Sequence, residues 1–94
     1  MSDAIVPWFV SATCYEQFRS TATDADVFFD NHDEWVDAAM EHERFAEQAG
    51  VIIIRIRMQF NDFEAWRHQH CLRNHADTRL QYAQIVAQKL LGST

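Results

Sequence analysis

The clearest pattern along the chain is an alternation of side-chain character over residues 51–60, directly after Gly50. Successive side chains of a strand point to opposite faces, so this pattern predicts a strand. One face of it starts apolar and ends with Arg55 and Arg57. The other face is apolar throughout and carries Ile52, Ile54, Ile56, Met58 and Phe60. We expect this strand to anchor the fold and to place two arginines side by side.

The remaining elements follow from capping residues and apolar spacing. Residues 4–10 predict a second strand, which lies at a sheet edge or starts near Pro7, because proline has no backbone N–H. Four helices are expected, separated early on by a polar loop over 20–26. They run over about 14–20 after Thr13 as N-cap, 32–49 after Asn31, from about 62 after Asn61, and about 75–91 after Asn74. Gly50 and Gly92 are expected to end the second and the fourth of these helices.

Each of the two longer helices has an apolar stripe that predicts its buried side. The helix over 32–49 is expected to bury Trp35, Ala38, Ala39, His42, Phe45, Ala46 and Ala49. The last helix is expected to bury Ala76, Leu80, Ala83, Val86, Ala87 and Leu90.

The order β-α-α-β-α-α predicts one α+β domain over 1–94, with three to four helices on a two- or three-stranded sheet. The connection between the two strands is long enough for a right-handed crossover between parallel strands. So small a sheet leaves edges open, and the long strand 51–60 invites pairing with a second copy. We therefore expect a homodimer, formed by strand pairing or by helices packed over the face of Arg55 and Arg57.

Several short motifs together resemble a group of small uncharacterised bacterial proteins, over nearly the whole chain. The motifs are Trp8-Phe9, Tyr15 with Phe18, Asp33-Glu34-Trp35, Gly50 with its strand, and Asp62-Phe63-Glu64-Ala65-Trp66. The resemblance implies a compact domain and no known activity. Those proteins tend to have a glycine that ends the helix after the second tryptophan, where this chain has Cys71.

Charge is unevenly distributed along the chain, whose net charge is −6. Residues 24–47 hold nine acidic residues against Arg44 alone, whereas residues 48–94 hold three acidic and six basic residues. The two halves can face each other through solvated charges, or the acidic segment can bind a basic partner or imitate nucleic acid. Direct nucleic-acid binding is not expected, because no broad basic patch exists.

Location is predicted from what the sequence lacks. Arg55 interrupts the longest apolar run, so no membrane span is expected. The acidic start of the chain lacks the basic region of a signal peptide, which makes the cytoplasm the expected location. Cys14 and Cys71 are expected to be reduced thiols there.

The favoured function is a non-enzymatic interaction module, such as an inhibitor, an immunity-type protein or an anti-defence protein. It would present the acidic helix over residues 32–47 to a basic protein partner. No cofactor and no catalytic residue is expected. The residues assigned to partner binding are Asp33, Asp37, Glu41, Glu43, Arg55 and Arg57. The two arginines can instead pair with the acids of residues 24–47.

A transition-metal-binding or small enzymatic domain is the alternative function. His68, Cys71 and His75 would share one face of an unbroken helix, and imidazole and thiolate bind zinc, copper or nickel. The pattern slips around residues 71–74, however, and no second ligand pair follows. For catalysis, His42 with Glu41 or Glu43 near it is a candidate base, and Cys14 near a helix N-terminus is the best nucleophile candidate.

Overall fold

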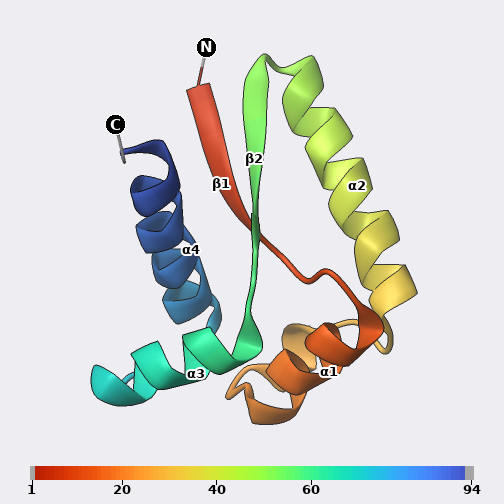
Figure 1. Ribbon diagram of the computed structural model, residues 1–94. Coiled ribbons are helices and arrows are strands. Elements are labelled where there is room, and N and C mark those ends of the chain that lie inside the picture. Colours follow the sequence, from red (N-terminus) through yellow and green to blue (C-terminus); the bar gives the residue numbers. More distant parts are fainter. Residues whose placement is uncertain (1, 93–94) are drawn as a thin grey trace.

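The computed structural model describes residues 2–92 and has the expected α+β class (Figure 1). In chain order its elements are β1 (Ser2–Trp8), α1 (Ala12–Thr21), a short 3-10 helix η1 (Ala25–Val27), α2 (His32–Gln48), β2 (Val51–Arg57), α3 (Phe60–Gln69) and α4 (Ala76–Leu91). The order of the main elements agrees with the expected β-α-α-β-α-α.

The sheet consists of β1 and β2, which run parallel as the long connection between them predicts. Ser2 pairs with Val51, and Trp8 pairs with Arg57. Both strands end earlier than expected, since Ser11 already caps α1 and Phe60 already belongs to α3. No third strand occurs within residues 2–92, so β1 and β2 are both edge strands.

Helices cover the two strands from opposite sides (Figure 1). Helix α2 packs along β2, α4 packs mainly along β1, and α1 and α3 lie across the base where the strands end. Ile5 lies beside α4, whereas Val6 and Ile53 lie beside α2. The upper half of the sheet is therefore less covered than its base, and Ile52 remains about half exposed.

The hydrophobic core lies at this base and is largely aromatic. Tyr15, Phe18 and Phe63 have no exposed surface. The ring centroids of Phe18 and Phe63 are 5.0 Å apart, and Phe9 lies 5.0 Å from Phe18. Such tilted ring pairs add to the free energy that burial itself provides. The full buried apolar set is Phe9, Cys14, Tyr15, Phe18, Ile56, Met58, Phe63, Tyr82, Ala83 and Ala87.

Three of the four predicted N-caps were misplaced. Ser11, not Thr13, caps α1 by accepting a hydrogen bond from the backbone N–H of Cys14. Helix α3 starts at Phe60 after Gln59, without a side-chain cap, so Asn61 lies inside it. His75 caps α4, because the side chain of Asn74 is used in a buried network described below. Asn31 caps α2 as expected, accepting from the N–H of Glu34.

The predicted buried stripes of α2 and α4 are wrong in part. Phe45 is 78% exposed, and Leu80 and Leu90 are also exposed. Instead, Glu43 faces β2, and Arg79 faces the loop before α2. Each of these two charged side chains finds an opposite charge inside the fold. Ala83 and Ala87 of α4 are buried as expected, and Trp35 of α2 packs against the core, so the buried sides are shifted from the predicted stripes and not replaced.

Candidate functional site

Helix α2 carries the acidic residues assigned to partner binding and is held at both ends by local signals. Asn31 caps its first turn, and Gly50 follows its last turn with φ +86°. That backbone conformation is unfavourable for residues other than glycine, so the glycine ends the helix and starts β2. Asp33 and Glu34 lie in the first turn, where the helix dipole stabilises carboxylates.

A two-pronged ion pair fixes the rotation of α2 on the sheet. Arg55 donates from Nε to Oε2 of Glu43 at 2.9 Å and from Nη2 to Oε1 at 2.6 Å. The guanidinium also lies 3.7 Å from the ring centroid of Trp8, at cation–π distance. Hydrogen bonding to Glu43 raises the pKa of Arg55 above its ordinary value. The pairing of an arginine with the acidic segment, one of the two roles considered for Arg55, is thus present.

The six residues assigned to partner binding therefore divide into two groups. Asp33, Asp37 and Glu41 are exposed on the outer side of α2, and each follows the one before it by four residues. They form no ion pair with any other residue in the range 2–92. Glu43 is buried and occupied by Arg55. Arg57 is exposed at the end of β2.

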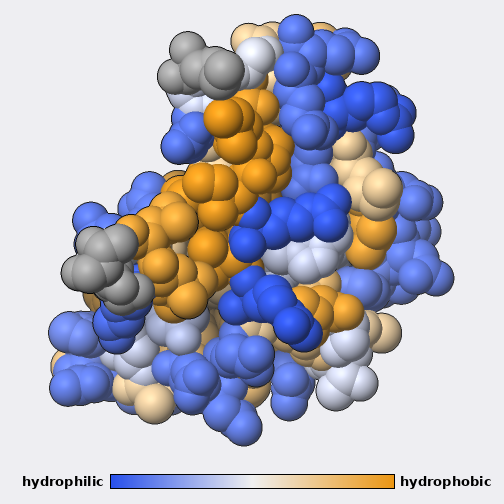
Figure 2. Space-filling model, turned by 45° about the horizontal axis from the view of Figure 1, so that its top comes forward, coloured by the Kyte–Doolittle hydropathy of each residue, from blue (hydrophilic) through white to orange (hydrophobic). Residues whose placement is uncertain are grey.

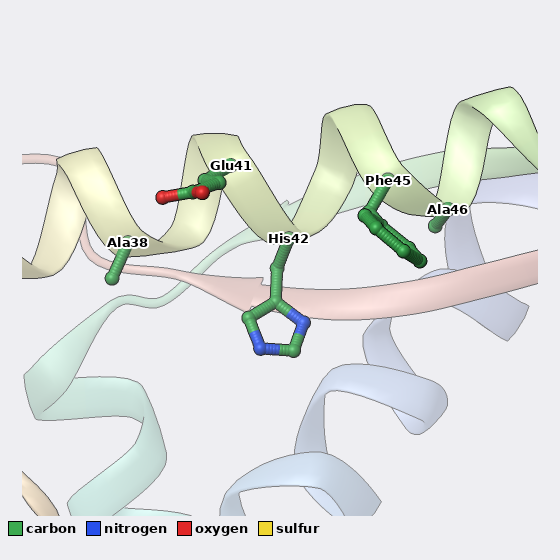
Figure 3. Close-up of a pocket in the computed structure, with 5 residues that line it drawn as sticks. All are labelled: Ala38, Glu41, His42, Phe45 and Ala46. Atoms are coloured by element: carbon green, nitrogen blue, oxygen red, sulfur yellow. The ribbon is translucent and has the colours of Figure 1, made fainter.

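Beside the acidic side of α2 lies an open concavity of about 570 Å³ (Figure 3). Its lining residues are Ala38, Glu41, His42, Phe45 and Ala46. Figure 3 shows His42 pointing away from the helix axis between the two alanines. His42 is exposed, which contradicts its expected place in the buried stripe. Its neighbour Glu43 is engaged by Arg55, so a base assisted by Glu43 is not supported.

The histidine-rich segment does not form the continuous face that the metal alternative requires. Helix α3 ends at Gln69, and Cys71 has φ +54°. The N–H of Cys71 bonds to the carbonyl of His68, and that of Leu72 bonds to the carbonyl of Arg67. These two bonds make a Schellman motif, in which Cys71 occupies the position that glycine favours. The helix therefore stops between His68 and His75.

The two outer members of that segment have structural partners instead. His75 caps α4, its Nδ1 accepting from the N–H of Asp77 at 3.4 Å. His68 lies 3.4 Å from a carboxylate oxygen of Glu64. Within residues 2–92, no three His, Cys, Asp or Glu side chains are grouped closely enough to hold a metal ion. Elemental analysis remains the direct test of the metal alternative.

Cys14 is not set up as a nucleophile. Its side chain is buried, and its Sγ donates to the carbonyl of Met58 at 3.4 Å. Burial raises the pKa of the thiol above its ordinary value, which outweighs its place near the start of α1. A thiol held protonated among apolar side chains is inert, so Cys14 is a core residue.

Sequence reasoning missed a buried polar network that joins the loop before α2 to α4. Arg79 donates to both carboxylate oxygens of Asp24 at 2.9 Å and to Oδ1 of Asn74 at 2.9 Å. Asn74 in turn donates to the carbonyl of Phe18 and to the hydroxyl of Thr21. The segment over 20–26 is thus tied to the core at Asp24. The one indication in the sequence was Arg79, a charged residue among the regularly spaced apolar residues of the last helix.

None of the helices within residues 2–92 combines the length and the apolar character that crossing a bilayer requires. Comparison with protein-family models, with curated proteins and with solved structures gave no match. The resemblance to small bacterial proteins therefore stays a prediction from the motifs quoted for it.

Proposed function

We propose that this chain is a non-enzymatic interaction module of the inhibitor, immunity-type or anti-defence kind, which binds a basic protein surface through α2. One observation carries the proposal. Asp33, Asp37 and Glu41 project from one side of α2 and are exposed. Arg44 is the single lysine or arginine of that helix. Carboxylates spaced in this way present a negative strip that attracts a basic surface.

The absence of internal partners for these three acids supports the proposal. The fold neutralises Glu43 and Asp24 with Arg55 and Arg79. The three outer acids of α2 have no such counterpart in the part of the chain that the structure describes. Charges that remain solvated cost little in the free protein, and they steer the approach of an oppositely charged partner.

We also propose that two copies of the chain associate through the sheet. β1 and β2 are edge strands, whose outward backbone groups can pair with another strand. Figure 2 shows apolar side chains gathered in a band over the strands and α4. Ile52 of β2 and Leu91 of α4 are 48% and 64% exposed. Contact of this band with a second copy would remove mainly apolar surface from water.

The cytoplasm is the compartment that we propose. Cys14 and Cys71 are both free thiols. Free thiols suit a reducing compartment.

A capture experiment at two salt concentrations tests the main proposal. The immobilised wild-type chain is compared with the double variant Asp37→Lys/Glu41→Lys in a cell lysate. The double variant Asp26→Lys/Asp62→Lys is the matched control, because it changes the net charge equally at exposed positions outside both α2 and the sheet. We expect basic proteins that the wild type and the control retain at low salt, and that the α2 variant loses. Equal capture by all three chains would contradict the proposal.

A further inference from the structure

An open groove runs along α2 toward the sheet. It lies next to the acidic side of α2 that we propose binds the partner. One part is the concavity of about 570 Å³ lined by Phe45 and its neighbours. A second part, of about 430 Å³, continues from it toward Val6 and Ile53 of the strands. Ala38, His42 and Ala46 line both parts, so the two are one groove along α2.

The lining of this groove is mostly apolar and shallow, and the ring of His42 stands between its alanines. Ala38, Ala39 and Ala46 are short enough to let another backbone approach closely, and Phe45 forms a raised edge. Phe45 is the most exposed of the large apolar side chains, at 78%. Glu41 lies four residues before it on the same lining, and Figure 3 shows the carboxylate directed toward the Ala38 end of the groove and the ring toward the Ala46 end. An apolar groove with an acidic edge favours a binding segment that has apolar side chains on one side and basic side chains next to them.

The dimensions favour a helix as this occupant. The groove follows α2 from Ala38 to Ala46, which is roughly 12 Å at the helical rise of about 1.5 Å per residue. Apolar side chains at positions i, i+3 or i+4 and i+7 of a helix cover about that length. Small ligands require enclosed pockets with converging polar groups. This groove is open, and no buried side-chain nitrogen or oxygen in the described part of the chain lacks a partner.

We propose that the groove between α2 and the sheet receives the apolar side of a basic amphipathic helix from the partner protein. Its apolar side chains lie against Phe45 and the alanines of α2, while its lysine or arginine side chains reach Glu41 and Asp37. This inference rests on the proposed function and names the form of the partner segment. The acids then set the rate of association, and the groove sets the rate of dissociation.

Two peptides of equal composition test the inference. Each has about 15 residues of leucine and lysine, a length at which a helix is marginal until it binds. In one peptide the leucines recur at helical spacing on a single side, and in the other they are spread around the helix. Fluorescence anisotropy measures their binding to the full chain at about 0.15 M salt, where distant charges are screened.

We expect the patterned peptide to bind at least about tenfold more tightly than its isomer, as one buried aromatic anchor provides. Phe45→Ala should remove that preference. Met40→Ala is the matched control, because Met40 is an exposed apolar residue of α2 outside the groove lining, and it should keep the preference. Equal affinities for the two peptides, or a preference that survives Phe45→Ala, would overturn the inference.

The charge-reversal variant separates this inference from the proposed function. If Asp37→Lys/Glu41→Lys weakens both peptides while the wild type does not distinguish them, the acidic surface binds basic segments and the groove does not. If the reversal leaves the binding of both peptides unchanged, the basic character of the partner is wrong, and with it the inference as stated.

Discussion

Glu43 of α2 and Arg55 of β2 form a two-pronged ion pair between the longest helix and the strand that follows it. The pair sets which side of α2 faces the sheet, and so leaves Asp33, Asp37 and Glu41 on the outside. By pairing with Arg55, Glu43 thus determines that the other three carboxylates face solvent, where a partner can reach them.

Removing one partner of that pair should destabilise the fold. We expect Glu43→Ala to lower the free energy of unfolding by about 1–2 kcal/mol, since Arg55 remains partly exposed and regains water. Glu47→Ala, at an exposed position of the same helix, is the control and should cost under about 0.5 kcal/mol. Urea unfolding followed by circular dichroism measures both values. Equal costs would show that the pair contributes no stability.

The Asp24–Arg79 pair should make stability depend on pH in the acid range. Hydrogen bonding to Arg79 lowers the pKa of the Asp24 carboxyl below its ordinary value of 3.8. The stability that this carboxylate contributes is therefore fully present above about pH 4 to 5 and is lost as the pH falls through the lowered pKa. Unfolding measured from pH 7 downward should show a decline that Asp24→Asn makes shallower.

That substitution also has a cost at neutral pH. Asp24→Asn leaves the buried Arg79 without its counter-charge, so we expect a loss of roughly 3 kcal/mol. Asp26→Asn, two residues away and exposed, should change neither the stability nor its pH profile. An unchanged acid profile in Asp24→Asn would mean that other carboxylates account for the decline.

Replacing Cys71 with glycine should stabilise the fold, because glycine is the residue that this backbone conformation favours. Its φ of +54° costs a non-glycine residue roughly 1 kcal/mol. Glycine loses part of this gain through the greater freedom of the unfolded chain, so we expect Cys71→Gly to stabilise by up to about 1 kcal/mol. Cys71→Ala should give no such gain. Thermal unfolding in the presence of a reductant compares the variants, and a less stable glycine variant would contradict the prediction.

The acidic side of α2 should act mainly on the rate of encounter. Once a partner is purified, Asp37→Lys/Glu41→Lys should slow its association by about tenfold or more at low salt and by less at high salt. The stability of the variant should change by under about 0.5 kcal/mol, because both positions are exposed. Stopped-flow mixing resolves the rates. A slower rate without salt dependence would point to a steric effect instead.

Association of two copies should be sensitive to the exposed face of β2. We expect the native chain to scatter light as a dimer and Ile52→Lys to shift it toward the monomer. Val27→Lys, at another exposed apolar position, is the control that should remain dimeric. A native chain that is a monomer at high micromolar concentration would show that the apolar band has another role.

The sequence predicted those parts of the fold that depend on neighbouring residues. Asn31 and Gly50 correctly marked the two ends of α2. The alternation of side chains after Gly50 correctly located β2. The parallel pairing followed from the length of the connection. The orientation of α2 did not follow, because it depends on Glu43 meeting Arg55 across the turn between helix and strand.

The candidate site was predictable to the same extent. The acidic character of α2 is a property of composition, whereas the groove exists because Phe45 and Ala38 lie beside the buried side of the helix. Asp24 and Arg79 are far apart in sequence, so neither residue indicates the other. Cys71 has a left-handed backbone that glycine would favour, so the residue type itself gave no indication of this conformation.

The pairing of Ser2 with Val51 also has a consequence for how the chain folds. β1 is synthesised before α1, α2 and β2, yet its only partner strand within residues 2–92 is β2. Until that strand emerges, the apolar residues of β1 have no sheet to join, and closing so long a loop is slow compared with forming a helix. Helix α2 can form early from its own caps and approach β2 through Glu43. We therefore expect sheet closure to limit the folding rate, and the unpaired β1 to be the segment most exposed to aggregation before it.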